Sequence, residues 1–341
     1  MAKKREELTP EQIKIQDKIE KNYWTDVVRK IIKDWRLYVM LLPLVLIFLF
    51  WRYFPLYGLL TAFKTSDTTS AILDRNFVGF QHFYNLVFGA DSAGFWQAFR
   101  NTFLLSFYSL LFGFPFPIIL ALFFNEINSN GYRSVLQIAT YLPRFVSTVV
   151  ITTLVTMLLK GGSVFSEPGV IAQMLVKIGM VPGEDAITGM LYIPKYFRAI
   201  YQVSGIWEMA GYGSIVYFAA IISISPTSYE AARIDGATKM QQLKHVVLPG
   251  ILSTITIMLI MQIGRLLMIG YEKVLLLYNS YTYSTADVVA TYVFVRAGMT
   301  AGGQTNQSLA SAADMINAVT SMLLVMGANL ISKKVSNTSL Y

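Results

Sequence analysis

The sequence has no cysteine and only two histidines, His82 and His245, among its 341 residues. Disulfides, thiolate catalysis and cysteine-ligated metal sites are therefore excluded. No Gly-Lys-Ser or Gly-Lys-Thr follows a glycine-rich loop, so the chain has no phosphate cradle of its own for ATP. We therefore expect this chain to be no enzyme and to bind no cofactor or metal itself.

Charged residues are also scarce, and the chain is strongly apolar. Charged residues make up 14% of it and apolar residues 54%, which does not suit a soluble surface. The bilayer is the expected solvent. The net charge of +8 comes largely from residues 1–36, a basic tail in front of a hydrophobic run. Anionic lipid headgroups are a simpler partner for such a tail than nucleic acid.

The basic tail 1–36 carries helix signals of its own. Thr9-Pro10-Glu11-Gln12 fits a capping box with proline at the first helical position. Apolar side chains then recur at helical spacing over 23–35, opposite a charged face. This predicts an amphipathic helix that lies on the inner leaflet or packs on its own protein. The tail is too long and too charged for a signal peptide, so we expect the following apolar run to be retained.

Six stretches are long enough to cross the membrane, which takes roughly 20 helical residues. They lie near 37–60, 101–124, 138–159, 206–225, 247–270 and 310–331. Four of the prolines, Pro43, Pro115, Pro117 and Pro143, fall within these stretches, where neighbouring helices can satisfy the freed backbone groups. The sequence thus predicts an all-α polytopic membrane protein with six main spans.

Lysine and arginine are denser in 1–36, 125–134, 223–247 and 333–341 than in the alternate connections 55–99, 160–200 and 269–310. By the positive-inside rule, the first set and both termini are cytoplasmic. His82 and His245 then lie on opposite sides of the membrane, where they cannot share a metal or a nucleophile. We expect short helices on the outer face over 80–88 and 170–181.

The cytoplasmic connection 226–249 is the most polar interior segment. Thr227-Ser228-Tyr229-Glu230 and Thr238-Lys239-Met240-Gln241 both fit the capping box, so two short helices are expected. Gly236 lies between them, where a residue without a Cβ can take a positive φ and turn the chain. We expect Asp235 to cap the second helix.

This segment resembles the EAA motif of permease subunits of binding-protein-dependent ABC importers. The match covers Glu230-Ala231-Ala232, Asp235-Gly236-Ala237, an amphipathic helix through Met240, Leu243 and Val247, and Leu248-Pro249. Flanking residues look like the carbohydrate-uptake branch: Ile206-Trp207, Gly211-Tyr212, Ala219-Ala220, Ile224 and Pro226.

Looser matches lie elsewhere in the chain. Residues 77–83 are similar to an early outer-loop pattern of the family, with His82 in place of the usual asparagine. Residues 141–147 and 286–293 look like the subgroup of larger oligosaccharide permeases that work with lipoprotein receptors. The resemblance spans roughly 37–335, which we take as the permease domain, followed by a short tail, 336–341.

The resemblance implies the type I ABC importer permease fold in a bacterial cell membrane. It implies pairing with a second homologous permease, two ATPase subunits that hold ATP and Mg, and an extracellular solute-binding lipoprotein that delivers an oligosaccharide. The residues implied at the ATPase interface are Glu230, Ala231, Ala232, Asp235, Gly236 and Ala237. For Glu230, two roles stay open: an ionic contact to the ATPase, and the capping-box acid for Thr227.

Polar side chains at membrane depth indicate the substrate path, because they are costly unless they face a cavity or one another. Glu208 lies beside Trp207 and one turn before Tyr212, which would offer a sugar a carboxylate acceptor and two aromatic faces. Pairing of Glu208 with an arginine such as Arg265 is the alternative. The expected substrate-path residues are Trp207, Glu208, Tyr212, Gln262, Arg265 and Asn317.

Three rival functions stay open on the sequence. A secondary transporter would use Arg/Glu pairs for ion coupling, and a membrane anchor or signalling scaffold would need no polar residues at membrane depth. The same ATP-driven machinery could also carry another cargo, such as amino acids or phosphate, because the EAA segment reports coupling and not cargo.

Overall fold

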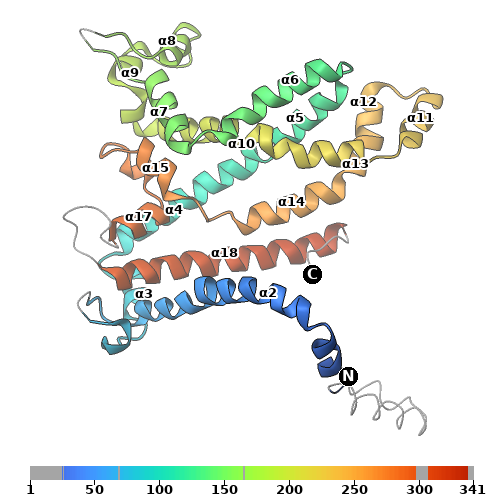
Figure 1. Ribbon diagram of the computed structural model, residues 1–341. Helices are drawn as coiled ribbons and strands as arrows, with labels where there is room; N and C mark the ends of the chain where they lie inside the picture. Colours follow the sequence, from blue (N-terminus) through green and yellow to red (C-terminus); the bar gives the residue numbers. More distant parts are fainter. Residues whose placement is uncertain (1–24, 26, 68–69, 164–165, 297–305, 337–341) are drawn as a thin grey trace. The chain divides into compact units, whose positions relative to one another are not determined.

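The computed structural model describes residues 25, 27–67, 70–163, 166–296 and 306–336 (Figure 1). Within these residues the regular elements are helices, apart from isolated bridges between Lys64 and Phe77 and between Ser163 and Ser166. The expected capping box at 9–12 and most of the tail 336–341 lie outside the described residues. The chain divides into two compact units, residues 1–60 and 61–341.

The first unit is a continuous apolar helical run. Residues 27–33 are helical, and α2 (Trp35–Phe48), η2 (Leu49–Tyr53) and η3 (Phe54–Phe63) follow without a break. The run Trp35–Phe63 is long and apolar enough to cross a membrane, and its hydrophobic side chains are exposed. It contains the predicted span 37–60, including Pro43 inside α2.

The second unit holds the remaining helices. Its first half comprises η4 (Ile72–Asp74), α3 (Gln81–Val87), α4 (Ser92–Tyr108), η5 (Ser109–Gly113), α5 (Pro115–Glu126), α6 (Asn130–Tyr141), η6 (Leu142–Phe145), α7 (Thr148–Leu158), α8 (Val170–Lys177), α9 (Gly183–Thr188) and η7 (Met190–Tyr192). Its second half comprises α10 (Pro194–Ile222), α11 (Pro226–Ile234), α12 (Lys239–Gln242), η8 (Leu243–Val247), α13 (Leu248–Gly250), α14 (Leu252–Gly264), α15 (Tyr271–Leu277), α16 (Tyr283–Ala286), α17 (Val289–Arg296) and α18 (Gln307–Ser336).

Four helical runs could each cross a membrane alone: Trp35–Phe63, Ser92–Glu126, Pro194–Ile222 and Gln307–Leu330. They correspond to four of the six predicted spans, although the prediction 206–225 extends three residues beyond the helix that ends at Ile222. The other two predicted spans are bent pairs of helices, so that the count reaches six only if each pair forms one span.

The prediction of one continuous helix over 138–159 is wrong. The segment consists of the end of α6, η6 and α7, and the stretch Asn130–Phe145 meets α7 at an angle of 101°. The break falls where Val146 is extended and the side chain of Ser147 accepts a hydrogen bond from the backbone N–H of Val149, which starts a new helix. Pro143 sits just before this break. A run of apolar residues alone did not reveal the bend, because hydropathy does not register a local cap.

The predicted span 247–270 also differs from the structure. Its helix α14 ends at Gly264, and the preceding helical stretch Lys239–Gly250 meets it at 59°. Beyond α14 the chain leaves the helix at Arg265 and reaches α15 after a short connection. The last part of the predicted span is therefore not helical.

The short helices α8 and α9 precede the N-terminal end of α10, and the loop 226–249 follows its C-terminal end. In Figure 1, α8 and α9 lie beyond one end of α10, and α11 and α12 beyond the other. The predicted short helices at 80–88 and 170–181 are present as α3 and α8. The pKa of Asp185 in α9 is lowered because its carboxylate accepts hydrogen bonds from Lys195 at 2.7 Å and from Tyr196 at 2.6 Å. These bonds fasten α9 to the start of α10.

Helix α10 packs along α5 and against the end of α6. A Cβ on Gly211 would lie 2.0 Å from the carbonyl oxygen of Thr140, and one on Gly213 would lie 3.1 Å from the ring of Pro117. Only glycine allows so close an approach between α10 and α6. A hydrophobic cluster packs at the C-terminal end of α10, where the loop 226–249 begins. Its buried members are Ala121, Tyr217, Ile221, Val247 and Ile251.

The close approach at Gly211 predicts a specific loss of stability. Gly211→Ala should force α6 away from α10 and lower the free energy of unfolding by about 1–3 kcal/mol, as overpacking does. Gly205→Ala in the same helix is the control, because its Cβ would meet only Lys273 Nζ at 3.6 Å. Thermal unfolding of the two variants measures the difference, and equal midpoints would contradict the close-packing argument.

Candidate functional site

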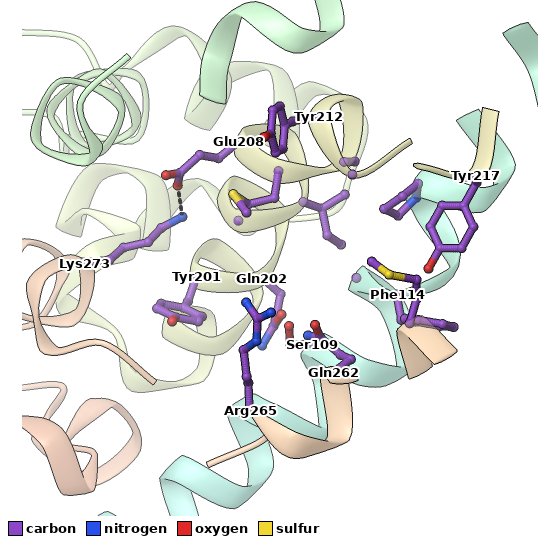
Figure 2. Close-up of a pocket in the computed structure, with 18 residues that line it drawn as sticks. Ser109, Phe114, Tyr201, Gln202, Glu208, Tyr212, Tyr217, Gln262, Arg265 and Lys273 are labelled. Carbon is purple, nitrogen blue, oxygen red and sulfur yellow. Dashed lines mark hydrogen bonds and ion pairs between the residues drawn. The ribbon is translucent and has the colours of Figure 1, made fainter. Parts of the chain in front are cut away.

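A cavity of about 530 Å³ lies beside the middle of α10 (Figure 2). Helix α10 provides most of its lining, and η5, α5, α14 and α15 contribute the rest. Ser109 and Gly113 of η5 line it where the helix widens into a π-type turn, a distortion that often occurs at functional sites. The polar and aromatic lining residues are Ser109, Phe114, Tyr201, Gln202, Glu208, Tyr212, Tyr217, Gln262, Arg265 and Lys273.

The cavity brings together four of the six side chains expected on the substrate path. Glu208, Tyr212, Gln262 and Arg265 line it. Trp207 lies outside this lining and is 45% exposed. Asn317 of α18 lies outside it as well, and its side chain donates a hydrogen bond to the carbonyl of Leu267 at 3.0 Å. The helix spacing placed Glu208 and Tyr212 on one face, whereas Trp207 falls on another.

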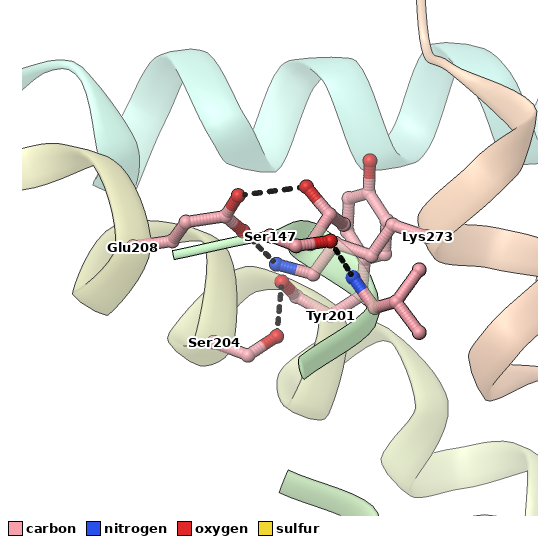
Figure 3. A network of polar contacts seen from close by, with 7 residues as sticks. Ser147, Tyr201, Ser204, Glu208 and Lys273 are labelled. Atoms are coloured by element: carbon pink, nitrogen blue, oxygen red, sulfur yellow. Dashed lines mark hydrogen bonds and ion pairs between the residues drawn. The ribbon is translucent and has the colours of Figure 1, made fainter. Parts of the chain in front are cut away.

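Glu208 is buried and holds three helices together (Figure 3). One carboxylate oxygen accepts a hydrogen bond from Thr148, the first residue of α7, at 3.2 Å. The other forms an ion pair with Lys273 of α15 at 3.0 Å. The alternative of pairing with Arg265 is therefore wrong: the partner is a lysine. Lys273 falls in the connection 269–310 that the sequence predicts to be outside the membrane, and only the folding of α15 against α7 and α10 brings it to Glu208.

Lys273 has a second contact that fixes its position. Its ammonium group lies 5.6 Å from the centre of the Tyr201 ring, within the range of a cation–π interaction. Burial lowers the pKa of Lys273, while the charge of Glu208 and its hydrogen bond act in the opposite direction. The ion pair thus keeps a charge on a lysine that burial alone would tend to neutralise.

The buried pair predicts a loss of stability that depends on pH. Glu208→Gln should lower the free energy of unfolding by about 3–5 kcal/mol, because it leaves a buried ammonium without its counter-charge. The folded-state pKa of Lys273 then falls further below its unfolded value of about 10.4. Since the unfolded chain binds the extra proton, the deficit should shrink as the pH rises toward that value.

Thermal unfolding of the wild type and of Glu208→Gln, followed from neutral pH up to about 10.4, measures how the loss of stability depends on pH. Asp185→Asn is the control, since it breaks an ion pair whose lysine, Lys195, is 59% exposed, and exposed pairs contribute little. A Glu208→Gln deficit that stays constant with pH, or that equals the control, would overturn the assignment of a buried charge pair.

The loop 226–249 has a defined turn at its centre. Helix α11 ends in a Schellman motif: the N–H of Ala237 bonds to the carbonyl of Ala232 at 2.9 Å, and that of Gly236 to the carbonyl of Arg233 at 3.1 Å. Gly236 has φ +75°, as the sequence predicts. Thr238 then forms a capping box with Gln241 and starts α12, which confirms the second predicted cap.

Two expectations for this loop are wrong. Helix α11 begins at Pro226 after Ser225, so Thr227 lies inside the helix and its hydroxyl contacts that of Ser225 at 2.7 Å. Proline at the first helical position set this boundary, and Glu230 is therefore not a capping-box acid. Asp235 ends α11 and does not cap the next helix, because Thr238 takes that place.

A hollow of about 440 Å³ lies between α11 and the helix that follows it. Ala231, Ala232, Asp235, Gly236 and Ala237 line it, together with Ser228, Gln241, His245 and Val246. Five of the six residues implied at an ATPase interface thus share one concave surface. Glu230 lies outside its lining and is exposed.

Apolar side chains and an ion pair define how this loop is held. Ile234 in α11 and Met240 in α12 are 86% and 70% exposed. Lys239, next to Met240, pairs with Glu126 at the end of α5, and Val247 is buried against the α5–α10 pair. The loop is therefore anchored to this helix pair while it presents exposed apolar side chains.

Apolar helices around a polar cavity, with an anchored helical loop at one end, define a membrane transport protein. The family model described as "Binding-protein-dependent transport system inner membrane component" matches residues 113–272. The chain belongs to this family of importer permeases, as its relatives show.

Two relatives from Bacillus subtilis (strain 168) cover most of the chain. Protein LplB is 34% identical over 309 residues, 91% of this chain and 92% of its own length. The polygalacturonan/rhamnogalacturonan transport system permease protein YteP is 34% identical over 313 residues, 92% of each chain. Since the alignments extend over nearly the whole length of both proteins, the similarity includes the outer helices as well as the loop 226–249.

Solved structures agree with this assignment. A crystal structure of a bacterial ABC transporter involved in the import of the acidic polysaccharide alginate matches with a TM-score of 0.78 and 40% identity, over 91% of this chain and 99% of that chain. A bacterial alginate ABC transporter in complex with an alginate pentasaccharide-bound periplasmic protein matches equally well, over 94% and 100%. This similarity supports the arrangement of the cavity and of the loop in one transport fold.

Proposed function

We propose that the chain is one of two permease subunits of an ATP-driven importer of oligosaccharides or related sugars. The observation that carries the proposal is the continuity of α10: the helix that lines the cavity ends at Ile222 and leads directly into α11 at Pro226. A push on α11 therefore reaches the cavity through one rigid helix.

In this proposal the loop 226–249 docks in a cleft of one of two ATPase subunits, which hold ATP and Mg. The concave surface of Ala231, Ala232, Asp235, Gly236 and Ala237 allows close approach, and the exposed Ile234 and Met240 provide apolar contact area. Glu230, exposed on α11, supplies an ionic contact. Force passes through packing of small residues, which transmits strain better than flexible side chains.

The proposed topology has six spans in a bacterial cell membrane, with each bent helix pair counted as one span and both termini in the cytoplasm. The basic tail 1–36 then meets the anionic inner leaflet. Helices α8 and α9 lie on the outer face, where an extracellular solute-binding lipoprotein docks. This places the loop 226–249 on the cytoplasmic side, which is where an ATPase has to bind it.

A sugar is the cargo that best fits the cavity. Tyr201, Tyr212 and Tyr217 offer aromatic faces to the C–H surfaces of sugar rings, and Gln262 offers an amide to hydroxyl groups. YteP and the alginate transporter bear names of polysaccharide transport, which supports a sugar cargo here too. Amino acids and phosphate lack the extended C–H faces that three tyrosines would contact.

Uptake measurements test this proposal against a secondary transporter. The importer, assembled with its second permease, ATPases and binding protein in vesicles, should accumulate labelled oligosaccharide only with ATP. An ATPase variant that cannot hydrolyse ATP should abolish accumulation. Accumulation that continues without hydrolysis, driven by an ion gradient, would decide for ion coupling through the Glu208–Lys273 pair instead.

The coupling role of the loop predicts a specific defect. Gly236→Val should abolish sugar-stimulated ATP hydrolysis and uptake while the protein stays in the membrane, because valine is strained at φ +75° and reshapes the loop. Gly179→Val is a matched control, since Gly179 also has φ +75° with nothing within 4 Å of its Cβ position, but follows α8 at the other end of α10. Loss of ATP hydrolysis in both variants, or in neither, would contradict coupling through this loop.

A further inference from the structure

The charges that line the cavity do not balance. Its charged residues are Glu208, Arg265 and Lys273, and the first and last of these form an ion pair. Within the described part of the chain, the Arg265 side chain forms no ion pair and no hydrogen bond. The cavity therefore carries one uncompensated positive charge.

Figure 2 separates the two sets of charges. Lys273 points toward Glu208, whereas the guanidinium of Arg265 points toward Gln202. Gln202 cannot compensate a cation, and its amide already donates to the carbonyl of Leu105 at 2.6 Å. No other carboxylate lines the cavity, so nothing within its described lining neutralises Arg265.

A second cation lies near the cavity without lining it. The guanidinium of Arg144 lies 5.9 Å from the centre of the Tyr212 ring, and Tyr212 lines the cavity. Arg144 and Arg265 are both exposed, and of the two only Arg265 lines the open cavity. Charges of one sign in a cleft raise the local concentration of ions of the opposite sign.

The position of Arg265 at the C-terminal end of α14 compensates only part of its positive charge. A cation at the C-terminus of a helix is favoured by the helix dipole, but that effect amounts to a partial charge. The guanidinium also carries five N–H donors in a planar fork, which matches the geometry of a carboxylate. Those donors have no acceptor within the described residues and face an open volume of about 530 Å³.

We propose that the cargo is an acidic sugar and that Arg265 binds its carboxylate. This inference rests on the proposed function and names the class of sugar: oligosaccharides of hexuronate units. Glu208 neutralises Lys273, so that Arg265 is the cation of the described lining that remains to pair with cargo. Tyr201, Tyr212 and Tyr217 contact the ring faces, and Gln262 contacts hydroxyl groups.

The test titrates the importer, assembled with its second permease and ATPases in lipid nanodiscs, with two tetrasaccharides. One consists of hexuronate units, and the other is its carboxyl-reduced neutral analogue with the same length and linkage. The wild type should bind the acidic sugar roughly tenfold to hundredfold more tightly, as expected for one charge-assisted contact.

Variants identify the residue responsible. Arg265→Gln should remove the preference by weakening binding of the acidic sugar alone, and Arg265→Lys should keep most of it, because the charge remains. Arg133→Gln, which removes an equal charge from α6 outside the cavity, should leave the preference unchanged. Equal binding of the two sugars by the wild type, or a preference that survives Arg265→Gln, would overturn the inference.

Uptake of the two sugars separates this inference from the proposed function. ATP-dependent uptake of the neutral analogue in preference to the acidic sugar would leave an oligosaccharide importer in place and refute only the acidic cargo. Absence of ATP-dependent uptake of both sugars, with the cargo presented by the cognate binding protein, would refute both.

Discussion

The packing of α10 against α5 and α6 is the contact on which the rest of the second unit depends. Gly211 and Gly213 let the helix backbones approach closely, which a membrane helix pair needs because lipid supplies no hydrophobic force between helices. The same helix lines the cavity on one side and leads into α11 at its end. Its rigidity therefore connects the cavity with the loop 226–249, and a change in its packing affects both.

Polar groups at membrane depth impose the second constraint. Glu208 satisfies it with two partners from separate segments, Thr148 and Lys273, so that one buried carboxylate fixes the bend between α6 and α7 as well as the position of α15. Arg265 is not compensated in this way and faces the cavity. In a membrane protein this contrast separates a polar group that holds the fold together from one that stays available to a ligand, which is the basis of the proposal for Arg265.

Much of the fold follows from the sequence because hydropathy and helix caps are local properties. Four spans, the short helices α3 and α8 and the turn at Gly236 are present where the sequence predicts them. The bend at 101° between α6 and α7 escaped prediction, because its cause is a cap at Ser147 inside an apolar run. The start of α11 was misplaced because Pro226 was not weighed against the capping-box pattern at Thr227.

The sequence alone indicated the bilayer as solvent, the family and the position of the loop 226–249, because composition and a contiguous motif carry that information. It also selected Glu208, Tyr212, Gln262 and Arg265 as unusual polar or aromatic residues within apolar helices. Only the tertiary structure decided which of them share a cavity and which charges cancel. Lys273 reaches Glu208 across 65 positions in the chain, and no local pattern encodes a contact made by two helices that meet only after folding.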